Sequence, residues 1–179
     1  MITAADLVPL RSAASDYAET ERLRGRLQEL RTQRASFFLT RDEFEQILRW
    51  KLRGQYGRQQ TLRAVNTEDV VRAVTGLALT LTHEDPDYEL ELRFGILCAL
   101  RGVSIPVASA ILALTYPEEY AVIDFRGWRQ MFGEQKNNFS LADYKRYVRA
   151  VRTLAEMLGW AAQETDAAIW EYDRRQTHS

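Results

Sequence analysis

Apolar residues recur along the chain at the spacing of amphipathic helices. Phe44, Ile47 and Leu48 share one helical face and follow Thr40 and Glu43, which stand at the spacing of a capping box. This segment predicts a helix from about 41 to 52. The same kind of pattern predicts helices over about 16–34, 67–79, 85–97, 105–114, 140–158 and 164–174, and another that begins near Asp124.

No stretch alternates apolar and polar residues over a length that predicts a strand. We therefore expect an all-α protein. No repeat, low-complexity tract or linker interrupts the pattern, which favours a single compact helical domain over residues 1–179. The polar, arginine-rich helix predicted over 16–34 has a weak apolar stripe, so residues 1–36 are expected to form a peripheral N-terminal segment.

The amino-acid composition limits the kinds of metal and disulfide site that the chain can form. The 179 residues are 46% hydrophobic and 27% charged, as in an ordinary globular protein. Cys98 is the one cysteine and His83 and His178 are the two histidines, which excludes a disulfide framework, a zinc site and a cysteine-ligated iron–sulfur cluster. We expect no metal site, although the carboxylates leave an all-oxygen magnesium site open. Cys98 lies on an apolar helix and is interpreted as buried filling, and His83 as a surface residue.

The chain shows neither the basic start and apolar run of a secretory signal nor a membrane-spanning segment, so we expect a cytoplasmic protein. Its net charge of −1 does not favour a polyanion binder. The charge is unevenly distributed, however: residues 21–63 hold eleven Arg or Lys against five acids, and residues 126–152 hold seven against two. Such runs are most often solvated faces, but they also suit a phosphate-rich partner.

Residues 97–114 predict a helical hairpin. An apolar helix end is followed by a tight connection centred on Gly102, and then by a second helix in which Ser104 is placed to cap and Pro106 lies in the first turn. Free backbone N–H groups at such a helix start form a natural phosphate site. Nucleic-acid backbone is therefore the expected ligand of this turn.

Asp124 follows an apolar run and is placed to cap the next helix, which is the ordinary role of such a residue. Its position after the hairpin suggests more. Residues 97–132 resemble the helix-hairpin-helix DNA glycosylase superfamily, whose pattern of a hairpin followed by a helix-capping aspartate is matched by Leu100, Gly102, Val103, Ala108, Ile111 and Ile123-Asp124.

The resemblance implies that Asp124 is the catalytic aspartate, which stabilises the positive charge that develops on the sugar as a base leaves. The place of the Schiff-base lysine of bifunctional members is taken by Pro106, so a β-lyase step is not expected. Ser104 replaces the second hairpin glycine, and the four-cysteine cluster of several relatives is absent. Segments 48–54 and 167–173 extend the resemblance to small bacterial proteins with the 8-oxoguanine glycosylase fold, from about residue 40 to the C-terminus.

Base excision requires a basic surface for phosphates and aromatic walls for a flipped base. No cofactor is expected, and a monovalent cation at the turn is left open. The predicted backbone-binding residues are Gly102, Val103, Ser104, Ile105, Arg126, Arg129, Lys51, Arg53 and Arg58, and the predicted base-pocket residues are Trp50, Tyr56, Phe125 and Trp128.

Three hypotheses follow. The first is a monofunctional DNA glycosylase acting on duplex DNA through Asp124. The second is a DNA-binding module of the same fold, in which Asp124 is only a helix cap. The third is a helical protein-interaction domain, which the near-neutral net charge and the acidic segment 84–91 favour.

Overall fold

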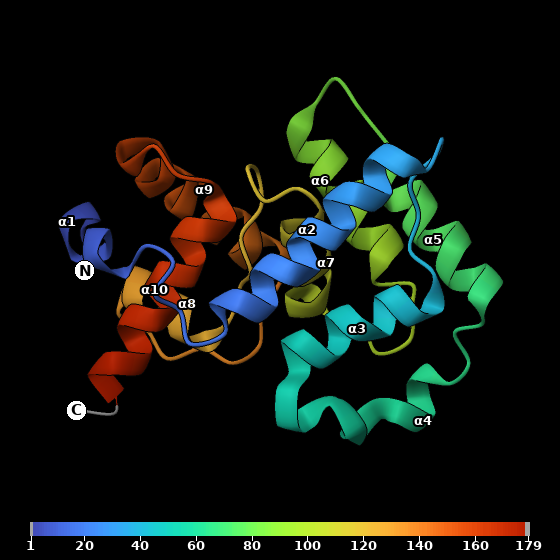
Figure 1. The fold of residues 1–179 in the computed structure, drawn as a ribbon, viewed down its shortest axis with the longest axis horizontal. Coiled ribbons are helices and arrows are strands. Elements are labelled where there is room, and N and C mark those ends of the chain that lie inside the picture. The colour runs from blue at the N-terminus through green and yellow to red at the C-terminus, as the bar shows by residue number, and fades with distance from the viewer. Residues whose placement is uncertain (1, 178–179) are drawn as a thin grey trace. The chain divides into compact units, whose positions relative to one another are not determined.

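The computed structural model describes residues 2–177, and every regular element within that range is helical (Figure 1). This confirms the all-α prediction. In chain order the elements are α1 (Ala4–Leu7), the 3₁₀ helix η1 (Val8–Leu10), α2 (Tyr17–Gln33), α3 (Arg41–Leu52), the 3₁₀ helix η2 (Arg53–Gln59), α4 (Gln60–Arg63), α5 (Glu68–Thr80), α6 (Pro86–Leu97), α7 (Ile105–Thr115), α8 (Phe125–Phe132), α9 (Leu141–Leu158) and α10 (Ala162–Thr177).

The residues divide into two compact units, which are described separately below. The central unit comprises residues 25–111, and the terminal unit comprises residues 1–24 and 112–179. Helices α2 and α7 each continue from one unit into the other. The prediction of one domain over 1–179, with 1–36 as a peripheral segment, stays a prediction. Within α2, Leu27 and Leu30 are nevertheless buried, so this polar helix does carry a short apolar face.

In the central unit, α5 contacts both α3 and α6. The capping box predicted at Thr40 is present: its side chain accepts a hydrogen bond from the Glu43 N–H and starts α3. Thr75 of α5 accepts a hydrogen bond from the backbone N–H of Leu39, 2.9 Å away, which fixes the chain just before α3. The apolar faces that meet in this unit include Phe44, Ile47, Leu48, Val71, Ala78, Leu79, Leu90, Phe94 and Leu97.

In the terminal unit, α10 contacts α1, α8 and α9. Ser140 caps α9 and Gly159 ends it with a positive φ of 67°, in agreement with the helix predicted over about 140–158. The chain between α7 and α8 passes through a buried extended stretch, Tyr120 to Ile123. The hydroxyl of Tyr144 on α9 donates to the carbonyl of Ala121 in this stretch, so α9 positions the residues that lead into α8.

Local structure departs from the sequence prediction in two places. The last helix is longer than predicted, because it begins at Ala162 and ends at Thr177. Between the helices predicted over about 41–52 and 67–79 the sequence pattern predicts no element, yet the chain there forms η2 and α4. The residue with positive φ after α3 is Arg53, at 51°, rather than Gly54. Short 3₁₀ turns of this kind carry no hydrophobic period that a sequence pattern reveals.

Candidate nucleic-acid interface

The predicted turn lies between α6 and α7 in the central unit. The N–H of Val103 donates to the carbonyl of Leu100 at 3.2 Å, and Gly102 between them has φ +82°, as in a type II turn. The carbonyl of Ser104 accepts the first hydrogen bond of α7, from the N–H of Ala108 at 2.9 Å. The turn therefore needs glycine only at position 102, and a serine at 104 is compatible with it.

Four backbone N–H groups were predicted to bind phosphate, and the turn leaves three of them without an acceptor. Within the described residues, the N–H groups of Gly102, Ser104 and Ile105 make no hydrogen bond. The N–H of Val103 is used inside the turn, and its side chain is buried. Three unbonded donors at the start of an eleven-residue helix suit an anionic ligand.

Asn66, just before α5, holds the turn from outside. Its side-chain amide donates to the carbonyl of Arg101 at 2.9 Å, and its side-chain oxygen accepts from the N–H of Arg101 at 3.0 Å. Asn66 is 3% exposed, whereas the side chain of Arg101 is exposed. The turn thus presents an arginine side chain from a backbone position that is fixed on both sides.

Arg63 of α4 packs against Gly102. A Cβ atom at position 102 would lie 2.6 Å from Cγ of Arg63 and 3.4 Å from the side-chain oxygen of Gln59. These contacts join the turn to the end of η2. Glycine is therefore required at 102 for its positive φ and also for the space that Arg63 occupies.

The guanidinium of Arg63 is 1% exposed and is held by two neighbours. Nε lies 3.3 Å from Oε2 of Glu45, one Nη donates to the carbonyl of Tyr56 at 2.9 Å, and the charge lies 4.4 Å from the centre of the Tyr56 ring. The Tyr56 hydroxyl donates to the same Glu45 oxygen at 2.6 Å. Tyr56 was predicted to line a base pocket, and the structure places it in the cluster that joins η2 to the turn.

The remaining predicted residues of this unit lie at the end of α3 and in η2. The guanidinium of Arg53 lies 5.9 Å from the centre of the Trp50 ring, and both Trp50 and Lys51 are half-buried. Arg53 and Arg58 are exposed. Basic side chains on η2 and the turn of the hairpin therefore belong to one unit and are linked through Tyr56 and Arg63.

In the terminal unit, Asp124 is the N-cap of α8, as predicted. Its Oδ1 accepts hydrogen bonds from the N–H groups of Arg126 and Gly127, both at 2.9 Å. Oδ2 accepts no hydrogen bond within the described residues. The carboxylate is half-buried, so one oxygen is committed to the helix and the other is available for a second interaction.

A buried polar pair supports the backbone around Asp124. Oδ2 of Asp166 on α10 accepts from the N–H of Val122 at 3.0 Å, and its Oδ1 accepts from the hydroxyl of Tyr147. That hydroxyl lies against Gly127, where a Cβ atom would overlap it. Burial, together with the negative charges of Asp166 and Asp124, raises the pKa of Tyr147 well above its ordinary value, so the hydroxyl stays a donor.

Arg126 and Arg129 were predicted to bind phosphate, and both already have a carboxylate partner. Asp173 of α10 is fully buried and lies 2.8 Å from Arg126 and 2.7 Å from Arg129, and its other oxygen accepts from Gln130 at 2.7 Å. Burial would raise the pKa of Asp173, but the hydrogen bonds from Gln130 and both arginines outweigh it and lower the pKa. The arrangement joins α8 to α10.

Phe125 and Trp128 differ in exposure. Phe125 is 41% exposed at the start of α8, with the Arg126 guanidinium 5.3 Å from its ring centre. Trp128 is 1% exposed, packs on Phe132 with ring centres 4.4 Å apart, and directs its indole N–H to Glu134 at 3.3 Å. Phe125 is thus the aromatic of this pair that a ligand can reach from solvent.

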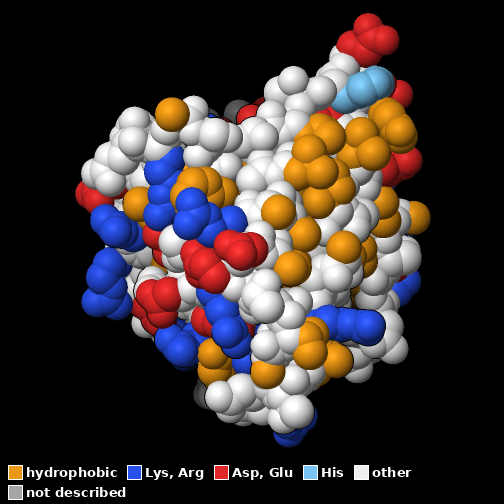
Figure 2. All heavy atoms as spheres, turned by 90° about the vertical axis from the view of Figure 1, so that its right-hand side faces the viewer, with side chains coloured by type: hydrophobic (Ala, Val, Ile, Leu, Met, Phe, Trp, Pro, Cys, Tyr) orange, Lys and Arg blue, Asp and Glu red, His pale blue; other side chains and the backbone are white. Residues whose placement is uncertain are grey.

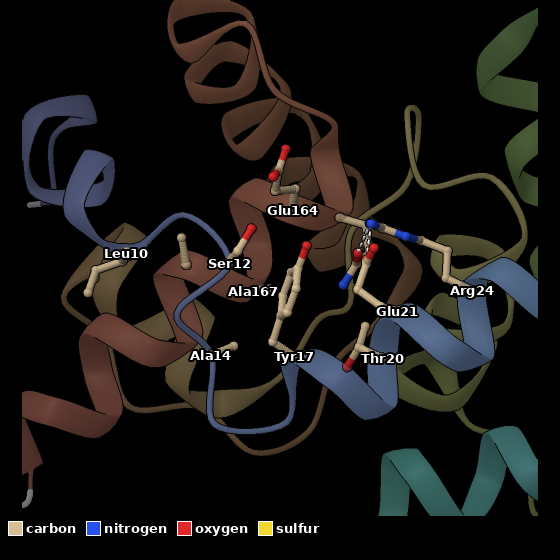
Figure 3. Close-up of a pocket in the computed structure, with 11 residues that line it drawn as sticks. Leu10, Ser12, Ala14, Tyr17, Thr20, Glu21, Arg24, Glu164 and Ala167 are labelled. Atoms are coloured by element: carbon tan, nitrogen blue, oxygen red, sulfur yellow. Dashed lines mark hydrogen bonds and ion pairs between the residues drawn. The ribbon is translucent and has the colours of Figure 1, made fainter.

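A small pocket in the terminal unit lies between α2 and α10, with Leu10, Ala14 and Tyr17 on one side (Figure 3). Its charged groups already have partners. Arg24 donates to Gln163 at 2.7 Å and also pairs with Glu21, and Glu164 pairs with Arg11 at 3.0 Å. Because Glu21, Arg24 and Glu164 are engaged in these contacts, they do not offer the pocket an unpaired charge for a ligand.

An apolar surface on α5 and α6 was not predicted. Figure 2 shows apolar side chains gathered on one face of the molecule. The ring of His83 contacts that of Tyr88, with centres 4.9 Å apart. Val70 and Leu77, seven residues apart and so on one face of α5, are about half exposed, as is Tyr88. His83 itself is exposed, as predicted.

Sequence reasoning missed several residues that shape these sites. Arg101 had a usable signal, because it is a basic residue directly before the glycine of the turn that was predicted to bind phosphate. No sequence signal was available for four other residues, because each contacts a segment at least 35 residues away along the chain: Asn66, Arg63, Asp166 and Asp173.

Comparisons with protein-family models, with curated proteins and with solved structures found no match. Among the described residues, no group of three or more His, Cys, Asp or Glu side chains is arranged to hold a metal ion. Within the same range, no helix has the length and apolar character needed to cross a membrane.

Proposed function

We propose that this protein binds duplex DNA through the central unit and releases a base with the help of Asp124, without a lyase step. The observation that carries the proposal is the turn at Gly102. Three of its N–H groups make no hydrogen bond to the part of the chain that the structure describes, and Arg63 joins it to the arginine-bearing η2. Backbone donors and arginines together are the groups that bind DNA phosphates. Arg53, Arg58 and Arg101 would supply the charge.

Asp124 suits the chemical step that the resemblance implies. When the bond between base and sugar breaks, the base leaves with the electron pair and positive charge develops at the sugar C1′, which water then attacks. A fixed carboxylate stabilises that charge. Oδ1 is held by α8, so Oδ2 is the oxygen that we assign to the sugar.

A second candidate is a DNA-binding module without catalysis. The observation that favours it is that Oδ1 of Asp124 already accepts two hydrogen bonds, which is a complete helix cap. In that case the carboxylate contributes stability alone.

Fluorescence anisotropy with two duplexes separates these candidates. One duplex is intact and the other carries a cationic abasic-site analogue that resembles the charged sugar. The proposal predicts tighter binding to the analogue, which Asp124→Asn abolishes while binding to intact DNA is kept. Equal, salt-sensitive binding to both duplexes would favour the non-catalytic module. No binding to either would refute both candidates and favour a protein partner for the apolar surface on α5 and α6.

Asp85→Asn is a matched control. Asp85 caps α6 in the same way, since its Oδ1 accepts from the N–H groups of Asp87 at 2.9 Å and Tyr88 at 3.2 Å. This variant removes one negative charge from an equivalent helix start. It should leave the preference for the analogue unchanged, and a loss as large as that of Asp124→Asn would make the effect one of overall charge.

A further inference from the structure

The turn at Gly102 has a partner outside the hairpin, and we propose that Asn66 is a positioning residue for DNA binding. Its side chain orients the backbone N–H groups that bind phosphate without touching the DNA itself. This inference rests on the proposed function and concerns the same surface. It assigns a role in ligand binding to a residue that lies just before α5, 35 positions from the turn.

The contact between Asn66 and Arg101 fixes a peptide plane. The carbonyl of Arg101 accepts from Asn66 at 2.9 Å. In a trans peptide the N–H of the next residue points away from that carbonyl. The N–H of Gly102 therefore points away from Asn66, and it is one of the donors that make no hydrogen bond within the described residues.

Asn66 is itself well anchored. Its backbone N–H donates to the carbonyl of Arg63 at 2.9 Å, and the next residue, Thr67, caps α5 by accepting from the N–H of Val70. The side chain is buried, so its two hydrogen bonds to Arg101 do not compete with water. A rigid donor array binds an anion better than a mobile one, because less conformational entropy is lost on binding.

Arg63 bounds the turn from another side. Its stem occupies the space next to Gly102. Its guanidinium is buried with Glu45, and one Nη makes no hydrogen bond to any of the described residues. A buried cation with an unsatisfied donor does not maximise stability. The contact between Arg63 and Gly102 therefore serves to hold the shape of the turn. Asn66 sets the orientation of the turn through its two hydrogen bonds to Arg101.

The test compares Asn66→Ala with Arg101→Ala. Arg101→Ala is the matched control, because it removes the side chain of the residue whose backbone Asn66 holds. DNA affinity is measured by anisotropy at several salt concentrations. Asn66→Ala should weaken binding about tenfold with an unchanged salt slope, because neutral N–H contacts release no counterions. Arg101→Ala should lower the slope by about one, because it removes a phosphate contact made by a cation.

Hydrogen exchange of the Arg101 amide, followed by NMR without DNA, tests the contact itself. This N–H donates to the side-chain oxygen of Asn66, so Asn66→Ala should speed its exchange and Asn66→Asp, which keeps that acceptor, should not. Asn66→Asp loses the donor to the Arg101 carbonyl and also adds a negative charge, and it serves if the alanine variant does not fold. It too should weaken DNA binding.

Two results overturn the inference alone: unchanged DNA affinity in both Asn66 variants, or a salt slope that falls in Asn66→Ala as it does in Arg101→Ala. If the unaltered protein binds no DNA at any salt concentration, the proposed function fails and the inference fails with it. The two failures are therefore distinguished by the behaviour of the unaltered protein.

Discussion

At the scale of single residues, Arg53 holds a backbone conformation that favours glycine, with φ 51° and ψ −127°. Such a conformation costs a non-glycine residue on the order of 1–3 kcal/mol. We expect Arg53→Gly to be more stable than Arg53→Ala by roughly that amount, measured by urea denaturation, since both variants lack the side chain and differ in backbone freedom. At Gln46, inside α3, the order should be the opposite: Gln46→Ala should be more stable than Gln46→Gly by about 0.5–1 kcal/mol. Equal stability of Arg53→Gly and Arg53→Ala would contradict the claim that the backbone at position 53 is strained.

Gly102 and Gly133 both have positive φ, at 82° and 71°, but only Gly102 has a neighbour within 4 Å of a Cβ position. Alanine at either site is expected to cost about 1 kcal/mol for the backbone conformation alone. Gly102→Ala should cost more than Gly133→Ala in thermal or urea denaturation, because the new Cβ meets the Arg63 stem. Adding Arg63→Ala should recover part of the difference. Equal costs at 102 and 133 would mean that Arg63 moves aside freely.

At the scale of elements, α8 depends on its cap. Asp124→Ala should lower the free energy of unfolding by about 0.5–2 kcal/mol, because the N–H groups of Arg126 and Gly127 lose their acceptor. Asp124→Asn should change it by less than about 0.5 kcal/mol, since asparagine caps as well as aspartate does. Urea denaturation of the two variants measures this. If Asp124→Asn lowers the free energy of unfolding by much more than this, a loss of preference for the abasic-site analogue would result from unfolding rather than from the missing charge.

The end of α10 makes the protein sensitive to acid. Hydrogen bonds from Arg174, and from Arg175, lower the pKa of Glu171 from 4.5 to about 2. A folded-state pKa below the unfolded value gives stability that is fully present above the unfolded pKa and is lost as the pH falls through the folded one. The unfolding free energy should therefore decrease between about pH 4.5 and 2, and decrease less in Glu171→Gln. Glu156→Gln, at an exposed position on α9, is the control. An identical acid response in Glu171→Gln would contradict this assignment.

At the scale of the whole molecule, DNA binding has to arise from a local charge, because the net charge is only −1. We expect the affinity for duplex DNA to fall steeply with salt, and the Arg53→Ala/Arg58→Ala double variant to reduce the log–log salt slope by about two. Arg22→Ala/Arg26→Ala removes the same charge from the exposed side of α2 and is the matched control. Equal slopes in the two double variants would show that the response follows total charge rather than η2.

Much of the local structure follows from interactions between residues three or four positions apart. Thr40 with Glu43, Ser140 with Asp143, and the two N–H groups capped by Asp124 are contacts of this range. Propensity and capping act within one turn of a helix, so the sequence predicts these helix starts. The positive φ at Gly102 is local in the same sense, since glycine alone adopts it without strain.

The sequence by itself determined the helical class, the main helix starts and the turn before α7. Only the tertiary structure decided that Arg126 and Arg129 are paired with Asp173, that Trp128 is buried, and that Asn66 and Arg63 shape the turn. These outcomes depend on which distant segments meet, because burial and ion pairing come from packing between elements, and no pattern within one helix records them.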